Sequence, residues 1–143
     1  MKKISLLLLL CLLPLSTFFV LTQSSAHTNI IYLHKEQKGT RSSQSHLNSF
    51  SSTGNVVLKF YADWCGPCNR MAPLINNCAA AMPDILFINI NRDYFTDLAS
   101  TFSVRSIPTL IFLHNGKEIG RYDGPPLTQE KLNKLVRRMF NNY

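Results

Sequence analysis

The sequence is poor in the residues that metal sites and nucleic-acid surfaces require. Its 143 residues contain four cysteines and four histidines, and its one Cys-x-x-Cys motif has no second such motif to pair with. The remaining candidate ligands are Cys78 and scattered histidines, so a four-ligand zinc site is not expected. We interpret Cys78 as a buried core residue rather than a third redox thiol. Basic residues are dispersed apart from Arg137-Arg138, which argues against nucleic-acid binding.

The N-terminal segment has the composition of an export signal. Lys2 and Lys3 precede an uninterrupted apolar stretch over 6–13, then Pro14 and a weaker apolar tail, and small residues end the segment at Ala26. This pattern predicts a secretory signal peptide over residues 1–26, cleaved after Ala26. The alternative is an uncleaved membrane anchor, since residues 4–21 are just long enough to span a bilayer. In either case we expect a bacterial-type export that makes the protein periplasmic or secreted.

The part of the chain after this segment has the size of one domain. Removal of 26 of the 143 residues leaves 117, enough for one hydrophobic core, and the net charge falls from +7 to +5 with the loss of Lys2 and Lys3. We expect residues 27–54 to supply an N-terminal strand and a polar segment, and residues 55–143 to form the core of the domain. We expect a monomer.

Strand-like and helix-like stretches alternate along this domain. Apolar runs, alternation and turn residues predict strands at 30–33, 55–62, 85–91, 109–113 and 117–122, and helices at 44–51, 68–82, 94–102 and after Thr128. Asn115-Gly116 between the last two strands is a strong hairpin signal. The last helix has an apolar stripe and basic residues elsewhere, which we interpret as a closing helix rather than a membrane-surface helix. This order of elements predicts an α/β domain with helices on both faces of a central sheet.

Two cysteines lie three residues apart at the start of a predicted helix, in Trp64-Cys65-Gly66-Pro67-Cys68. On a first helical turn such thiols share a face and come close enough for a disulfide. Unpaired backbone N–H groups and the positive helix end favour a thiolate, so we expect Cys65 to be the nucleophile and the more shielded Cys68 to be the resolving thiol. Gly66 leaves room for a protein substrate, Pro67 suits a first turn, and Trp64 is a predicted docking platform.

From about residue 29 to its end the chain resembles a thioredoxin. Besides the Trp-Cys-Gly-Pro-Cys motif, the resemblance rests on Pro73, on Ile107-Pro108, on the Asn-Gly hairpin and on Gly124. It implies the thioredoxin fold, with a central mixed sheet flanked by helices. It also implies a cis-Pro108 against the cysteine pair, an Ile107 backbone that pairs with substrate, and Gly124 beside the active site.

At one position the sequence departs from that family's pattern. Many thioredoxins carry a buried acid six residues before the first cysteine, and this chain has Lys59 there. The acid's usual lysine partner would fall near Phe87 or Asn89, which are both uncharged. An ammonium near the thiols would favour thiolate and make the disulfide more oxidising, whereas a neutral or outward-pointing lysine would have little effect.

Together these features predict an exported thioredoxin-like oxidoreductase that reduces protein disulfides through a Cys65–Cys68 cycle, with no bound cofactor and no metal. Its expected partners are protein disulfide substrates and an upstream thiol reductant or membrane electron donor. Membrane contact is expected only if the N-terminal segment stays uncleaved. Two alternatives remain: the same chemistry run as a disulfide oxidase, isomerase or electron relay, and a non-catalytic binding module on the same scaffold.

Overall fold

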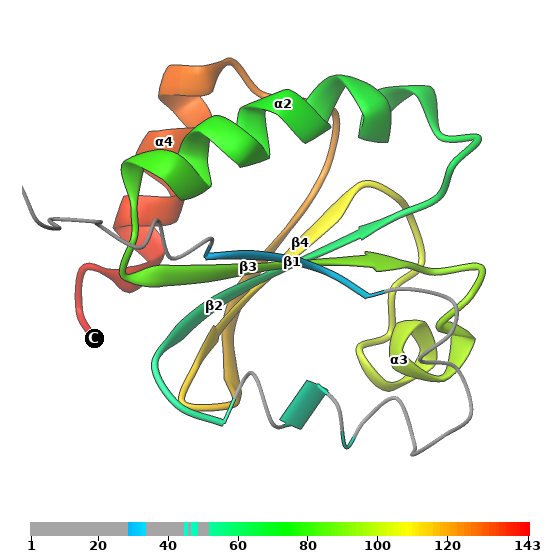
Figure 1. Cartoon of the computed structure of the whole chain (residues 1–143), viewed down its shortest axis with the longest axis horizontal. Coiled ribbons are helices and arrows are strands. Elements are labelled where there is room, and N and C mark those ends of the chain that lie inside the picture. The colour runs from blue at the N-terminus through cyan, green and yellow to red at the C-terminus, as the bar shows by residue number, and fades with distance from the viewer. Residues whose placement is uncertain (1–28, 34–44, 46, 49–51) are drawn as a thin grey trace, which may run out of the picture.

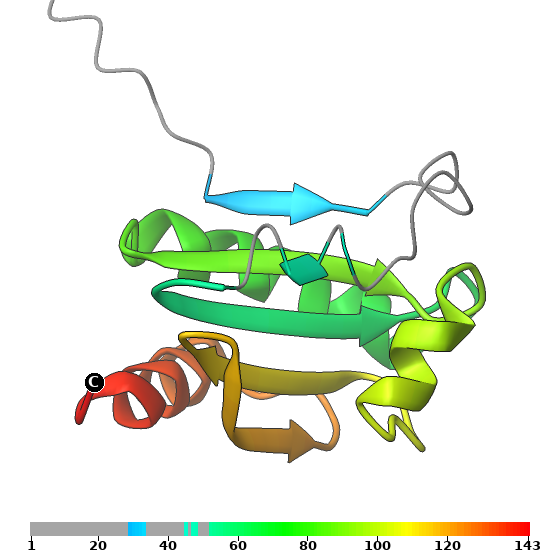
Figure 2. The same cartoon turned by 90° about the horizontal axis from the view of Figure 1, so that it is seen from below.

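A five-stranded mixed sheet forms the centre of the molecule. The computed structural model describes residues 29–33, 45, 47, 48 and 52–143. Their elements are β1 (Ile30–Tyr32), β2 (Asn55–Tyr61), α2 (Gly66–Ala81), β3 (Ile85–Asn91), α3 (Thr96–Thr101), β4 (Thr109–His114), β5 (Lys117–Asp123) and α4 (Gln129–Phe140). The strand order is β1-β3-β2-β4-β5 (Figure 2). β1 and β2 run parallel to β3, and β4 and β5 are antiparallel to their neighbours, so the predicted fold class is confirmed.

Helices cover both faces of this sheet. α2 and α4 lie on one face and α3 on the other (Figure 1). Because successive side chains of a strand point to opposite faces, β2 contributes to two cores. Leu58 and Phe60 pack into the core on the α3 side, whereas Val57 packs into the core beneath α2 and α4.

The predicted elements agree with the structure except near some ends. The helix expected at 94–102 begins at Thr96, because hydrogen bonds to Asn91 stabilise a turn just before it. The Asn91 side chain accepts a hydrogen bond from the backbone N–H of Asp93, and the Asn91 carbonyl accepts one from the backbone N–H of Phe95. The helix expected at 68–82 begins at Gly66, so Cys65 is its N-cap and Cys68 lies in its first turn.

The closing helix α4 behaves as expected. The Thr128 hydroxyl caps it by accepting a hydrogen bond from the backbone N–H of Lys131 at 3.4 Å. Leu132, Val136 and Phe140 are buried against the sheet, which confirms the interpretation of a closing helix with one buried face.

Two sequence predictions fall wholly or partly outside the described residues. The signal peptide over 1–26 lies outside them, and of the helix expected at 44–51 only residues 45, 47 and 48 are described. These three are helical, and Leu47 is fully buried. No helix in the described part of the chain is long and apolar enough to cross a bilayer.

Strand register brings distant segments to one edge of the sheet. Tyr61 at the end of β2 pairs with Asn91 at the end of β3, and Phe60 pairs with Thr109 at the start of β4. Thr109 in turn pairs with Asp123 at the end of β5. The segments that follow β2, β3 and β5 and the segment that precedes β4 therefore meet at this edge, which we call the site edge.

Candidate active site

Cys65 and Cys68 form a disulfide at the site edge, where α2 begins. Their Cα atoms are 5.2 Å apart and their sulfurs 2.07 Å apart. Cys65 is the N-cap of α2, and its sulfur accepts a hydrogen bond from the backbone N–H of Cys68 at 3.2 Å. In the reduced state the same N–H group and the positive end of the helix stabilise a Cys65 thiolate.

The two sulfurs differ in accessibility. Both are buried, Cys65 at 4% and Cys68 at 1% exposure, so Cys65 is the slightly more exposed of the two. Cys68 lies one turn further into the helix, and both cysteines belong to a cluster with Ala62, against which Tyr61 and Ile107 pack. This difference supports the assignment of Cys65 as nucleophile and Cys68 as resolving thiol, which stays a prediction.

Gly66 and Pro67 separate the cysteines and open the helix. Pro67 stands in the first turn, where its missing N–H removes no helical hydrogen bond. A Cβ atom on Gly66 would lie 3.7 Å from Nη1 of Arg70, so the Arg70 guanidinium reaches back to the approach to the disulfide. The absence of a side chain at Gly66 therefore keeps that approach open.

The Ile107–Pro108 segment faces the disulfide, as the resemblance implies. The peptide bond between the two residues is cis, and the Ile107 carbonyl oxygen lies 3.9 Å from the Cys65 sulfur. A hollow of about 260 Å³ beside it is lined by Pro67, Pro108 and Gly124, together with Ser106, Ile107, Asp123 and Pro125. The structure thus brings the sequence-predicted residues of the motif, the proline loop and Gly124 together in one place.

Trp64 is the most exposed large side chain near the site, at 71%. Its indole Nε1–H donates a hydrogen bond of 2.8 Å to Asp93, and the neighbouring Asp63 accepts one of 3.2 Å from the Tyr94 hydroxyl. These two acids were not predicted from the sequence, although each is the second residue after a strand that ends at the site edge. By holding the indole at one edge, Asp93 leaves the ring available as the flat platform expected for substrate.

Lys59 is buried on the α2 side of the sheet and has no carboxylate partner among the described residues. It is 4% exposed, and its Nζ lies 5.4 Å from the centroid of the Tyr61 ring. Tyr61 also packs against the cysteine cluster, so a single ring separates the lysine from the redox pair. Burial lowers the pKa of Lys59 to about 8, so at pH 7 about nine-tenths of this amine is an ammonium.

Asn89 stands beside Lys59 in the parallel pair of β2 and β3. Of the two positions considered for a charged partner, this register selects Asn89 rather than Phe87. The Asn89 side chain is buried, and its Nδ2 has no hydrogen-bond partner within the described parts of the chain. The buried acid–base pair is therefore replaced by a cation next to a neutral amide.

Cys78 lies further along the same helix, away from the disulfide. It is free and fully buried. Burial raises the pKa of its thiol, the nearby Arg137 partly opposes this, and the net result is a pKa of about 11. This agrees with its interpretation as a core residue. Among residues 29–33, 45, 47, 48 and 52–143 no group of three or more histidines, cysteines or acids is placed to hold a metal ion.

Comparisons with known proteins agree with this geometry. The family model described as Thioredoxin matches residues 37–138. A thioredoxin from Chlamydia pneumoniae is 40% identical over 82 residues, which cover 57% of this chain and 80% of that protein. The thioredoxin NaTrxh of Nicotiana alata is 33% identical in structure-based alignment, with a TM-score of 0.64 over 81% of this chain and 96% of that one. A thioredoxin mutant from Halobacterium salinarum reaches a TM-score of 0.66 at 27% identity, over 80% of this chain and 95% of the other.

Proposed function

The chain belongs to the thioredoxin family and is a thiol–disulfide oxidoreductase, and from this premise we propose that it reduces disulfides of proteins outside the cytoplasm. The observation that carries the proposal is the position of Cys65. This residue is the N-cap of α2, and its sulfur lies next to the Ile107 carbonyl. A sulfur there is stabilised as a thiolate and lies next to backbone that an extended substrate segment can pair with.

The reaction follows from the two sulfurs. The Cys65 thiolate attacks one sulfur of a substrate disulfide, that S–S bond breaks, and the departing substrate thiolate takes up a proton. Cys68 then loses its proton and attacks the Cys65 sulfur of the mixed disulfide, which releases the second substrate thiol. Two electrons pass to the substrate and the chain is left with its Cys65–Cys68 disulfide. An upstream dithiol reductant then restores the dithiol form and completes the cycle.

Reduction of insulin disulfides by the purified chain tests this proposal. We expect Cys65→Ser to lower the rate to background, because no nucleophile remains. Cys78→Ser is the matched control, since it removes a thiol from the same helix that does not touch the disulfide, and it should retain activity. A parent chain with no activity above background would favour the alternative of a non-catalytic binding module, and a rate unchanged in Cys65→Ser would show that Cys65 is not the nucleophile.

We place the enzyme outside the cytoplasm because of the lysine-led apolar segment and the small residues up to Ala26. The mature protein is then expected to begin at His27. N-terminal sequencing of protein recovered from the exported fraction checks this expectation. A sequence that begins at Met1, with the protein retained in membranes, would replace the cleaved signal by an anchor.

One observation favours a second function, the oxidation of substrate dithiols by the same chemistry. Lys59 is a buried amine with no carboxylate beside it in the described structure, and if its ammonium acts on the cysteine pair it stabilises thiolate and so favours the reduced enzyme. The Cys65–Cys68 reduction potential separates the two directions. A potential near −270 mV, the approximate value for thioredoxin, supports a reductase, and one near −120 mV, the approximate value for a strong oxidant, supports an oxidase.

A further inference from the structure

Three hollows follow one another along the loop of residues 103–108. The first, beside the disulfide, is lined on this loop by Ser106, Ile107 and Pro108. The second, of about 370 Å³, shares Ser106 with the first and adds Arg105 and Ser103. The third, of about 470 Å³, shares Ser103 and Arg105 with the second. A segment that leaves Cys65 along this loop therefore passes through all three.

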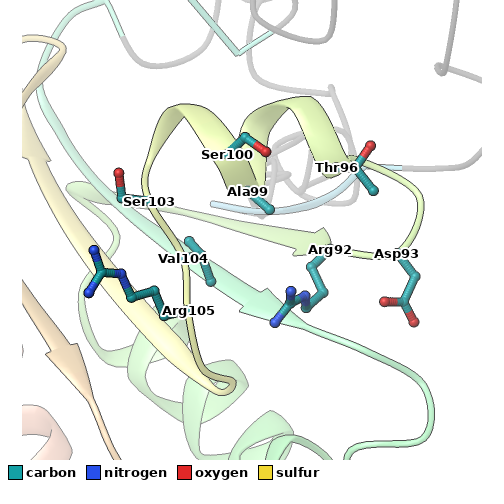
Figure 3. Close-up of a pocket in the computed structure, with 8 residues that line it drawn as sticks. All are labelled: Arg92, Asp93, Thr96, Ala99, Ser100, Ser103, Val104 and Arg105. Carbon is teal, nitrogen blue, oxygen red and sulfur yellow. The ribbon is translucent and has the colours of Figure 1, made fainter.

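The third hollow has an apolar floor and a polar rim. Ala99 and Val104 are buried at its base, and hydroxyls of Thr96, Ser100 and Ser103 stand on its α3 side. Figure 3 shows the side chains of Arg92 and Arg105 on the opposite side from these hydroxyls. The arginines come from the end of β3 and from the 103–108 loop, so the strand register that builds the active site also builds this hollow.

Its two guanidinium groups outnumber the one carboxylate in the hollow, and neither is paired with it. Neither Arg92 nor Arg105 makes an ion pair within the described part of the chain, where Arg121 with Glu118 is the one such pair. The single acid in the hollow, Asp93, already accepts the hydrogen bond of the Trp64 indole. The hollow thus presents two free planar donors that match a carboxylate, together with hydroxyl groups that can add hydrogen bonds.

We propose that this hollow binds an acidic side chain of the protein substrate, a few residues from the disulfide cysteine that Cys65 attacks. The proposal rests on the proposed function. Cys65 lies against Ile107, and Arg105 is two residues away from Ile107 along the loop. Two residues of extended chain span about 7 Å. An Asp or Glu about two to four residues from the reacting cysteine reaches the arginines from there.

Two model substrates test the proposal. They are disulfide-linked peptides of the same sequence, except that one carries Glu and the other Gln at positions two to four residues from the cysteine. We expect the unaltered chain to reduce the Glu peptide with a higher kcat/KM. Arg105→Gln and Arg92→Gln should each lower that preference by about threefold to fivefold and leave the Gln peptide unaffected, as expected for exposed ion pairs.

A remote arginine supplies the control. Arg138 is exposed on α4, across the sheet from the hollow, and Arg138→Gln should leave both rates unchanged. The preference should also shrink as salt is raised from about 0.05 to about 0.5 M, because ions screen exposed charges. Equal rates for the two peptides, or a preference that survives in the Arg92→Gln/Arg105→Gln double variant, would overturn the inference. Failure to reduce either peptide would instead count against the proposed function.

Discussion

The two ends of α2 hold cysteines of opposite character. At its N-terminus Cys65 caps the helix, accepts an N–H hydrogen bond and lies next to Ile107, which lines a surface hollow. About three turns further on, Cys78 is sealed between the helix and the sheet, and burial raises its pKa to about 11. Arg137 lies near Cys78, and Lys59 lies against the ring of Tyr61, which packs on the cluster that contains Cys65.

At Cys78, solvation outweighs a nearby positive charge, and the predicted nucleophile Cys65 differs from it in helix position. Arg137 lowers the pKa of Cys78, yet the loss of water around the sulfur outweighs it. At the N-terminus the backbone itself supplies the stabilising N–H groups, and they need no side chain. The reactive and the inert cysteine can therefore belong to one continuous helix.

The largest effect is expected when the resolving thiol Cys68 is removed, which tests the assignment of Cys65 as the reactive cysteine of α2. Cys68→Ser should abolish turnover and accumulate covalent substrate adducts on Cys65, because the nucleophile remains and nothing releases its mixed disulfide. Non-reducing gels and mass spectrometry of the exported fraction would detect the adducts. If Cys65→Ser accumulates adducts in place of Cys68→Ser, the two roles are reversed.

Replacing Lys59 tests whether its charge helps the reactive end. If the ammonium stabilises the thiolate, Lys59→Met should raise the pKa of Cys65 by about one unit and make the reduction potential more negative by about 30 mV. Lys59→Asp should move both in the same direction. Thiolate absorbance titration measures the pKa, and an unchanged value in Lys59→Met would leave Lys59 as a packing residue.

The same substitution predicts a change in the pH dependence of stability. Burial lowers the pKa of Lys59 from 10.5 to about 8, so between these values the unfolded chain binds more protons than the folded one. The free energy of unfolding therefore rises with pH across that window, by at most about 1.4 kcal/mol per pH unit. In Lys59→Met this rise should disappear, and denaturant titrations at pH 7 and pH 10 would show it.

The smallest effect is expected at the sealed end of the helix. Cys78→Ala should leave activity intact and cost about 1 kcal/mol of stability through the lost packing of one sulfur atom. Burial raises the pKa of Cys78 from 9.0 to about 11, so between these values the folded chain binds more protons than the unfolded one. The free energy of unfolding of the parent chain therefore falls as pH rises through that range, which is opposite in sign to the effect of Lys59. Lys59→Met is therefore best measured in a Cys78→Ala background. Loss of activity in Cys78→Ala would make it a third redox thiol.

Local patterns in the sequence were sufficient for most elements. The apolar runs of β2, β3 and β4 and the Asn115-Gly116 turn specify their structure through neighbours in the chain, and Asn115 and Gly116 both have the positive φ that such a turn requires. The start of α3 was placed two residues early because Tyr94 and Phe95 continue an apolar pattern, while the turn at Asn91 depends on a side-chain hydrogen bond.

The candidate site was predictable where a motif carries it, and its surroundings were not. Cys65, Cys68 and Pro108 belong to recognisable patterns. Asp93 and Arg105 do not, because their positions follow from the register that joins β2 with β3 and β4. That register is a property of the folded sheet, and nothing in the local sequence around either residue specifies it.

The meeting of strand ends at one edge also sets when the enzyme becomes reactive during folding. Phe60 and Thr109 are neighbours in the sheet but far apart in the chain, so the surroundings of Cys65 form only after a long loop has closed. Until then the helix N-terminus lacks a fixed position and the two cysteines are ordinary thiols. Under the proposed export of an unfolded chain, the activated nucleophile would form only once the sheet has assembled outside the cytoplasm.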